Sequence, residues 1–130
     1  ISSYPPRLCG IGTFCEEARE FIQKRHPERD VLVISHTDGA GEGVIPIMDP
    51  PSRPDWWRPV ADKIEQLKPY AVHIQHEYGL YEHYDDEGAG DNNRGFLQLL
   101  DALKAWPTVV EPHTVHGRLR DHEVGFLRRM

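Results

Sequence analysis

The sequence predicts an α/β protein with a Rossmann-like parallel sheet flanked by helices. Apolar segments suited to buried strands begin near residues 31, 71 and 108, and a segment with helical periodicity separates each pair. A strand spacing of about forty residues is typical of right-handed βαβ units. The length fits one domain, so we expect residues 1–130 to form a single Rossmann-like unit.

The expected strands differ in character. Residues 31–35 are continuously apolar, as in a strand buried on both faces. Residues 70–76 contain β-branched residues and form the predicted central strand, and residues 108–111 form the last. Residues 44–48 suit a short strand that Pro46 confines to an edge, and residues 1–4 resemble the end of a strand, as if the chain were cut there.

Helices are expected between these strands. Thr13 and Glu16 have the spacing of a capping box, and Pro27 ends that helix. Asp55 is the expected cap of a second helix, with Pro59 in its first turn. Its predicted buried face carries Val60, Ile64 and Leu67, a third helix covers residues 96–103, and a last helix over residues 121–130 turns Val124 and Leu127 inward.

Composition excludes several classes of function. The net charge of -6 argues against a nucleic-acid partner bound through a basic face. No apolar run approaches the roughly 20 residues of a membrane span. The start of the chain lacks the pattern of a signal peptide, so we expect a cytoplasmic protein. Cys9 and Cys15 match no zinc or redox spacing and are expected to be reduced thiols.

The first candidate site is His76-Glu77, where the central strand stops being apolar. Ligands of open parallel sheets bind beyond the carboxyl ends of the strands. Two ionisable groups at that position therefore suggest a site. The alternative is that both residues only cap the following loop.

Two further loops are expected at the same edge of the sheet. Gly10 and Gly12 precede a helix start, where free backbone N–H groups attract an anion such as phosphate. A third glycine is missing, so the dinucleotide fingerprint is incomplete and a simple tight turn is the alternative. His113 follows the last strand and could hydrogen-bond a ligand, or bond only to nearby backbone. His116 is a weaker candidate in the same loop, residues 113–117.

Other features have structural interpretations. His73 and His76 point to opposite faces of a strand and no helical zinc motif is present, so we expect no catalytic metal. Trp56 and Trp57 suit packing at a helix start, and the acidic loop of residues 81–94 suits a solvated face. The absence of a Gly-x-Ser-x-Gly elbow argues against a serine hydrolase.

Three blocks together resemble the N-terminal half of retaining glycosyltransferases of the GT-B fold, the "group 1" or family 4-like nucleotide-sugar enzymes. They are residues 4–14 (Tyr-Pro-Pro-Arg-Leu-Cys-Gly-Ile-Gly-Thr-Phe), 73–79 (His-Ile-Gln-His-Glu-Tyr-Gly) and 112–115 (Pro-His-Thr-Val). The blocks occur in the order found in that family and span most of the chain.

The resemblance implies a function for these blocks. The domain would hold the hydroxyl acceptor and contribute to transfer of a sugar from a nucleotide diphosphate with retained configuration, without a metal or other cofactor. Catalytic roles would fall to His113, His76 and Glu77. Substrate or phosphate binding would fall to Arg7, Gly10, Gly12, Tyr78 and Thr114.

The resemblance also implies a missing partner. The family's C-terminal nucleotide-binding domain is not in these residues, so we expect the isolated chain to be inactive and its bare face to allow self-association. The alternative function is a non-catalytic α/β ligand-binding or regulatory domain, and a hydrolase using His76 and Glu77 is a third possibility.

Overall fold

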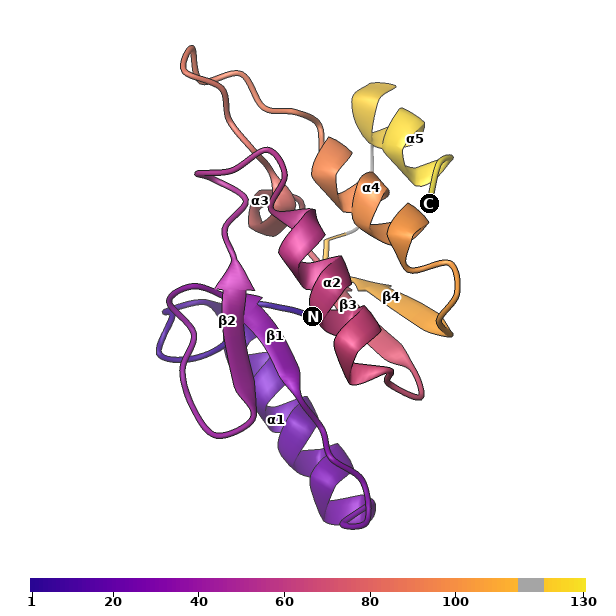
Figure 1. The fold of residues 1–130 in the computed structure, drawn as a ribbon. Helices are drawn as coiled ribbons and strands as arrows, with labels where there is room; N and C mark the ends of the chain where they lie inside the picture. The colour runs from indigo at the N-terminus through magenta and orange to yellow at the C-terminus, as the bar shows by residue number, and fades with distance from the viewer. Residues whose placement is uncertain (115–120) are drawn as a thin grey trace. The chain divides into compact units, whose positions relative to one another are not determined.

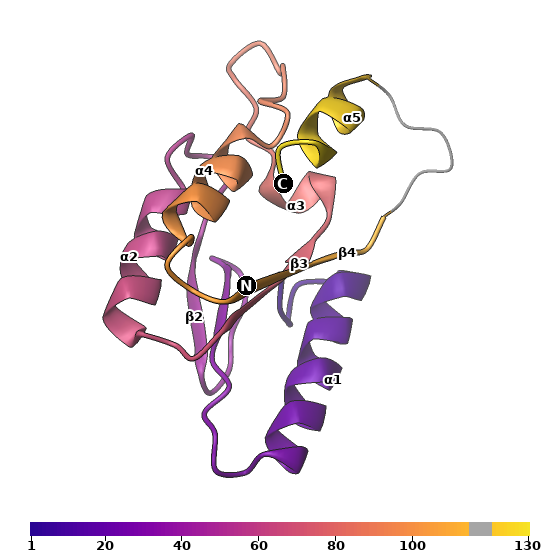
Figure 2. The ribbon, with the colours of Figure 1, turned by 90° about the vertical axis from the view of Figure 1, so that its right-hand side faces the viewer.

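The structure, a computed structural model, describes residues 1–114 and 121–130, without the side chain of His122. The chain is mixed α/β and divides into two compact units, Ile1–Met48 and Asp49–Met130, which we describe one at a time (Figures 1 and 2). Each unit has one pair of parallel strands, with one described helix in the first unit and four in the second. The α/β class, the parallel pairing and the flanking helices are therefore confirmed, whereas the single continuous sheet and single domain stay predictions.

The first unit pairs β1 (Val33–His36) with β2 (Val44–Met48) in parallel, beginning at Val33 opposite Val44. All four residues of β1 are buried, as its apolar run predicts. The core joins Tyr4, Cys15 and Val33, with Val44 packed against them, so α1 (Gly10–Arg25) lies along this strand pair (Figure 1). Residues 1–4 form no strand, although the Ser2 amide donates to the Ile34 carbonyl at 3.1 Å.

The start of α1 differs from the predicted capping box. The helix begins at Gly10 with Cys9 as its N-cap, and the Thr13 amide donates to the Cys9 carbonyl at 3.1 Å. Thr13 therefore lies inside the first turn and cannot cap it. Gly12, in the first turn, packs on the backbone of Tyr4, where an added Cβ would lie 3.4 Å from two backbone atoms.

The second unit pairs β3 (Val72–His76) with β4 (Thr108–Pro112) in parallel. α2 (Trp57–Leu67) and α4 (Arg94–Ala102) pack against each other, side by side in Figure 1. A short α3 (Tyr78–Tyr81), absent from the sequence prediction, follows β3, and α5 (Asp121–Leu127) is the last element. The loop between α3 and α4 extends away from the strands (Figures 1 and 2).

Three details of these helices correct the sequence prediction. Asp55 does not cap α2, because the helix starts one residue later with Trp56 as N-cap and the Asp55 carboxylate pairs with Arg53. Leu67 is 38% exposed because α2 ends there. Along α5 the fully buried residues are Glu123 and Phe126, whereas Leu127 is exposed.

None of the helices in the described ranges is long and apolar enough to span a membrane.

The starts of α2 and α4 are held together by Trp56, as its predicted packing role requires. Its side chain is 0% exposed, and its ring lies 5.6 Å from that of Tyr81. The ring also covers Gly95 in the first turn of α4, where an added Cβ would lie 2.5 Å from Trp56 Nε1. Only a residue without a side chain fits there, so Gly95 sets how closely the two helix starts approach.

We expect Gly95→Ala to lower the free energy of unfolding by about 1–3 kcal/mol, because overpacking displaces the indole and outweighs the better helix propensity of alanine. Urea denaturation checks this. Gly79→Ala in α3 is the matched control, since no atom lies within 4 Å of its added Cβ. A Gly95→Ala protein as stable as the wild type would contradict the argument.

Candidate functional site

The carboxyl ends of β3 and β4 bring four of the predicted site residues together. His76 stands opposite Pro112 in the parallel register, and the His113 amide donates to the His76 carbonyl at 2.8 Å. Directly beyond, the Thr114 hydroxyl donates to the Glu77 carboxylate. We call these four residues, His76, Glu77, His113 and Thr114, the β3–β4 junction.

Glu77 fastens this junction. One of its carboxylate oxygens accepts the Tyr78 amide at 3.0 Å, which makes Glu77 the N-cap of α3. The other oxygen accepts the Thr114 hydroxyl. The capping role considered from the sequence is therefore confirmed for Glu77, and the same carboxylate also links the two strand ends.

The imidazole of His76 is buried among aromatic rings. Its centroid lies 4.5 Å from that of Phe96, 5.0 Å from Phe126, 5.1 Å from Tyr78 and 5.6 Å from Tyr81. The residue is 2% exposed. Within the second unit the ring of His76 is therefore part of the core.

A chain of polar side chains fixes how His76 carries its proton. The Asn93 amide nitrogen donates to the Glu82 carboxylate, so the Asn93 oxygen faces His76 Nε2 at 3.3 Å. An amide oxygen only accepts, so the Nε2 atom of His76 must carry the hydrogen. Glu82 also accepts the amides of Asn92 and Asn93, at 2.7 and 3.1 Å.

Burial in this cluster lowers the pKa of His76 to about 4, although the hydrogen bond with Asn93 and the charge of Glu77 oppose the shift. The nearby His113 adds to the lowering. His76 is therefore neutral at pH 7. A buried neutral imidazole with one fixed tautomer acts as a rigid structural element rather than as a proton carrier.

Sequence reasoning missed Glu82 and Asn93, since it treated the loop of residues 81–94 as a solvated acidic face. Asn93 is 1% exposed and has a left-handed backbone (φ 57°) at the start of α4. Asparagine is among the few residues that tolerate this conformation. The sequence feature that could have revealed this role is an asparagine directly before the apolar pattern of a helix.

A hollow of about 300 Å³ opens beside the His76 cluster. We call it the Tyr78 hollow. It presents aromatic rings together with a carboxylate and amide groups. Its lining residues are Tyr78, Gly79, Glu82, Tyr84, Gly90, Asn92, Asn93 and Phe126. Tyr78, predicted to bind substrate, therefore lines a hollow next to the β3–β4 junction.

The remaining predicted residues, Arg7, Gly10 and Gly12, belong to the first unit. Arg7 pairs with Asp38 at 2.9 Å. Gly10 is exposed, and no atom lies within 4 Å of an added Cβ, whereas Gly12 is buried. The units are described separately, so convergence of this turn with the β3–β4 junction stays a prediction. His116 and the loop at residues 115–117 lie outside the described residues.

The pKa of the Cys9 thiol indicates which sign of charge this turn favours. Burial raises the pKa of its thiol, but the hydrogen bond from Ser3 at 3.5 Å lowers it. The amides of Gly12 and Ile11 and the charge of Arg7 lower it further, so that the pKa falls below its ordinary value. The start of α1 thus favours negative charge, as a helix N-terminus does.

In the described part of the chain, no group of three or more His, Cys, Asp or Glu side chains comes together in a way that could hold a metal ion. His73 is exposed and pairs with Glu111 at 3.0 Å, away from the buried His76.

Comparisons with known proteins give no match: no family model fits the sequence, and neither a curated protein nor a solved structure is significantly similar to the chain. The resemblance to GT-B glycosyltransferases therefore rests on the three sequence blocks alone.

We expect stability to fall at acidic pH through His76. Its folded pKa of about 4 lies below the ordinary value of 6.5, so the unfolded chain binds the proton first as the pH falls. The stabilisation is complete above pH 6.5 and is lost between 6.5 and 4, amounting to about 3 kcal/mol.

Urea denaturation of the wild type and of His76→Gln across this pH range measures the effect. The variant should be less stable at neutral pH and should lose much of the pH dependence. His73→Gln, on the exposed side of the same strand, is the control and should keep it. If the free energy of unfolding changed equally with pH in the wild type and in His76→Gln, His76 would be excluded as the source of the pH dependence.

Proposed function

We propose that this chain is the acceptor-side domain of a retaining glycosyltransferase of the GT-B fold, in which both strand pairs belong to one Rossmann-like sheet. The observation that carries the proposal is the β3–β4 junction. Two motif blocks that resemble the family, residues 73–79 and 112–115, meet there through the His113 amide and the Glu77 carboxylate.

The Tyr78 hollow supports a carbohydrate ligand. Sugars present apolar faces to aromatic rings and hydroxyl groups to amides, and this hollow is lined by Tyr78, Tyr84 and Phe126 together with Asn92. Its volume of about 300 Å³ lies at the lower end of small-molecule sites. A single monosaccharide of an acceptor is a ligand of suitable size.

The proposal assigns different roles to the junction residues. His113 follows β4 directly and would hydrogen-bond the reacting sugar. His76 and Glu77 would position it, because His76 is buried and both Glu77 oxygens are already engaged. Arg7, Gly10 and Gly12 would approach the donor diphosphate, which the electropositive start of α1 favours.

A donor screen on the complete polypeptide tests the proposal. We expect release of UDP, GDP or ADP from one class of nucleotide sugar when a hydroxyl acceptor is present, and no release by the 130-residue chain alone. If neither protein released a nucleotide from any donor, the result would count against a transferase.

We expect His113→Ala in the complete protein to lower turnover by about 10²-fold or more, with only a small change in melting temperature. The backbone bond from residue 113 to His76 survives the substitution, so the junction should keep its form. His73→Ala is the matched control and should leave turnover unchanged. A lowered melting temperature with unchanged turnover would instead assign His113 a structural role.

Two observations favour a second candidate, a non-catalytic α/β ligand-binding or regulatory domain. Both carboxylate oxygens of Glu77 accept hydrogen bonds from the protein itself, and His76 is neutral and buried. On this alternative the Tyr78 hollow binds a sugar but no transfer follows, and the chain alone would bind monosaccharides while the complete polypeptide releases no nucleotide.

A further inference from the structure

Gly79 lines the Tyr78 hollow at a position where the backbone does not require glycine. It lies in α3 and is not among the glycines with a left-handed backbone. No atom of the described residues lies within 4 Å of a Cβ added to it. Glycine is less favourable than alanine within a helix. The open space beside Gly79 is therefore kept at a cost to the helix.

Two other glycines of the second unit have an explanation in the packing around them. A Cβ added at Gly90, which also lines the hollow, would collide with the Glu82 carboxylate. A Cβ added at Gly95 would collide with the Trp56 ring. Packing within the described chain thus explains Gly90 and Gly95 but not Gly79.

The side chains around Gly79 suit a sugar ring. The Tyr78 and Phe126 rings lie 5.4 Å apart with their planes at 59°, and Tyr84 is 50% exposed. Asn92 donates its backbone amide to Glu82 at 2.7 Å, and within the described chain its side chain forms no hydrogen bond. Aromatic rings pack on the apolar face of a sugar, and an amide both donates to and accepts from hydroxyl groups.

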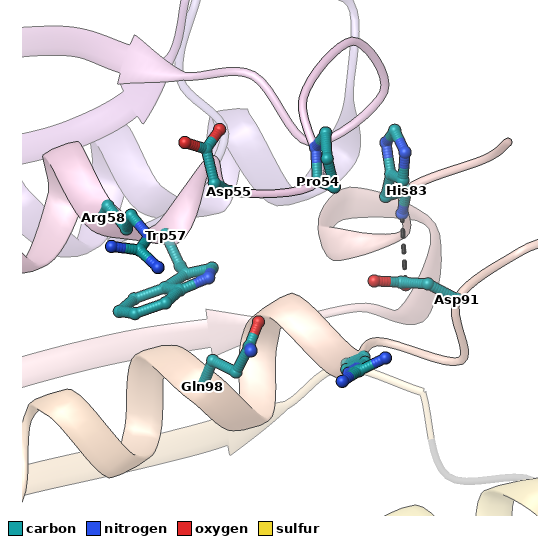
Figure 3. A pocket seen from close by; sticks show the side chains of 8 residues that line it. Pro54, Asp55, Trp57, Arg58, His83, Asp91 and Gln98 are labelled. Atoms are coloured by element: carbon teal, nitrogen blue, oxygen red, sulfur yellow. Dashed lines mark hydrogen bonds between the residues drawn. The ribbon is translucent and has the colours of Figure 1, made fainter.

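A short hairpin holds one wall of the hollow in place. Figure 3 shows its base, where the Asp91 carboxylate accepts the His83 amide at 3.3 Å. The Asp91 amide donates back to the His83 carbonyl at 2.9 Å. One residue further on, Tyr84 and Gly90 form an antiparallel bridge. These paired residues bring Tyr84 to the hollow without a ligand being present.

The charge of the lining favours an uncharged ligand. Among the described residues that line the Tyr78 hollow, Glu82 alone is charged, and its oxygens accept the amides of Asn92 and Asn93. A cationic group that would attract an acidic sugar is absent from this lining. Another hollow, of about 370 Å³ at the starts of α2 and α4, is lined by both carboxylates and guanidinium groups and favours no one class of ligand (Figure 3).

We propose that Gly79 is the specificity-determining residue of the Tyr78 hollow, which binds an uncharged pyranose. The sugar ring lies against the backbone of Gly79, with its apolar face toward the aromatic rings and a hydroxyl bonded to Asn92. A side chain at residue 79 would occupy the space of the sugar ring. This inference rests on the sugar ligand proposed above for the hollow, but it requires no glycosyl transfer.

NMR titration of the 130-residue chain with methyl glycosides of glucose, galactose, mannose and N-acetylglucosamine tests the inference. We expect at least one of them to shift the signals of the Gly79 amide and the Asn92 side chain in a saturable way, and methyl glucuronide to shift neither. Gly79→Ala should weaken the binding at least tenfold. Its melting temperature should equal or exceed that of the wild type, because alanine is the better helix former.

Gly125→Ala is the matched control. Gly125 is also a helical glycine of the second unit with no described atom within 4 Å of an added Cβ, but it does not line the hollow. This variant should bind the glycoside as the wild type does. Four results would overturn the inference: no binding of any uncharged glycoside, unchanged binding by Gly79→Ala, a lowered melting temperature of Gly79→Ala, or equal binding of methyl glucuronide.

The titration contains no nucleotide sugar, so its outcome is separate from that of the donor screen. Glycoside binding that depends on Gly79, with no nucleotide release by the complete polypeptide, would reject the transferase and keep the role of Gly79. Nucleotide release without such binding would keep the transferase and reject the role of Gly79.

Discussion

The parallel pairing of β3 with β4 is the constraint on which the candidate site depends. Parallel strands end at the same edge of a sheet, so groups distant in the chain become neighbours once the register is fixed. Here the register places His76 opposite Pro112, and the backbone bond from His113 extends the ladder by one residue. Glu77 then ties the two segments beyond the strands. Each of these contacts would be lost with a shift of one residue.

An aromatic cluster packs around His76 at the end of this strand pair. Rings from α3, α4 and α5 surround one neutral imidazole at the end of β3, and its ring nitrogen faces the side-chain oxygen of Asn93. A buried polar group needs its hydrogen bond, so Asn93 and Glu82 are as much part of this core as the rings. The loop that carries them is therefore held by the same residue that ends the strand.

Strand positions were predictable because apolar runs and prolines mark them locally: β1, β3 and β4 lie within two residues of expectation, and β2 matches residues 44–48. Caps were less predictable. Thr13 and Asp55 have the right residue type, but the helices begin with Cys9 and Trp56 as N-caps, neither of which forms a side-chain cap bond. Burial of His76 and the partnership of Glu82 with Asn93 depend on contacts between elements, which periodicity in one segment does not encode.

The loop between α3 and α4 is anchored at its base and independent at its tip. Glu82 and Asp91 hold the base, whereas Asp85 folds residues 85–89 back on themselves through the amides of Glu87 and Ala89. The tip is exposed and touches none of the buried rings. Changes of length or charge at the tip can therefore move Tyr84 and Gly90, which flank it and line the Tyr78 hollow, while the aromatic cluster around His76 stays as it is.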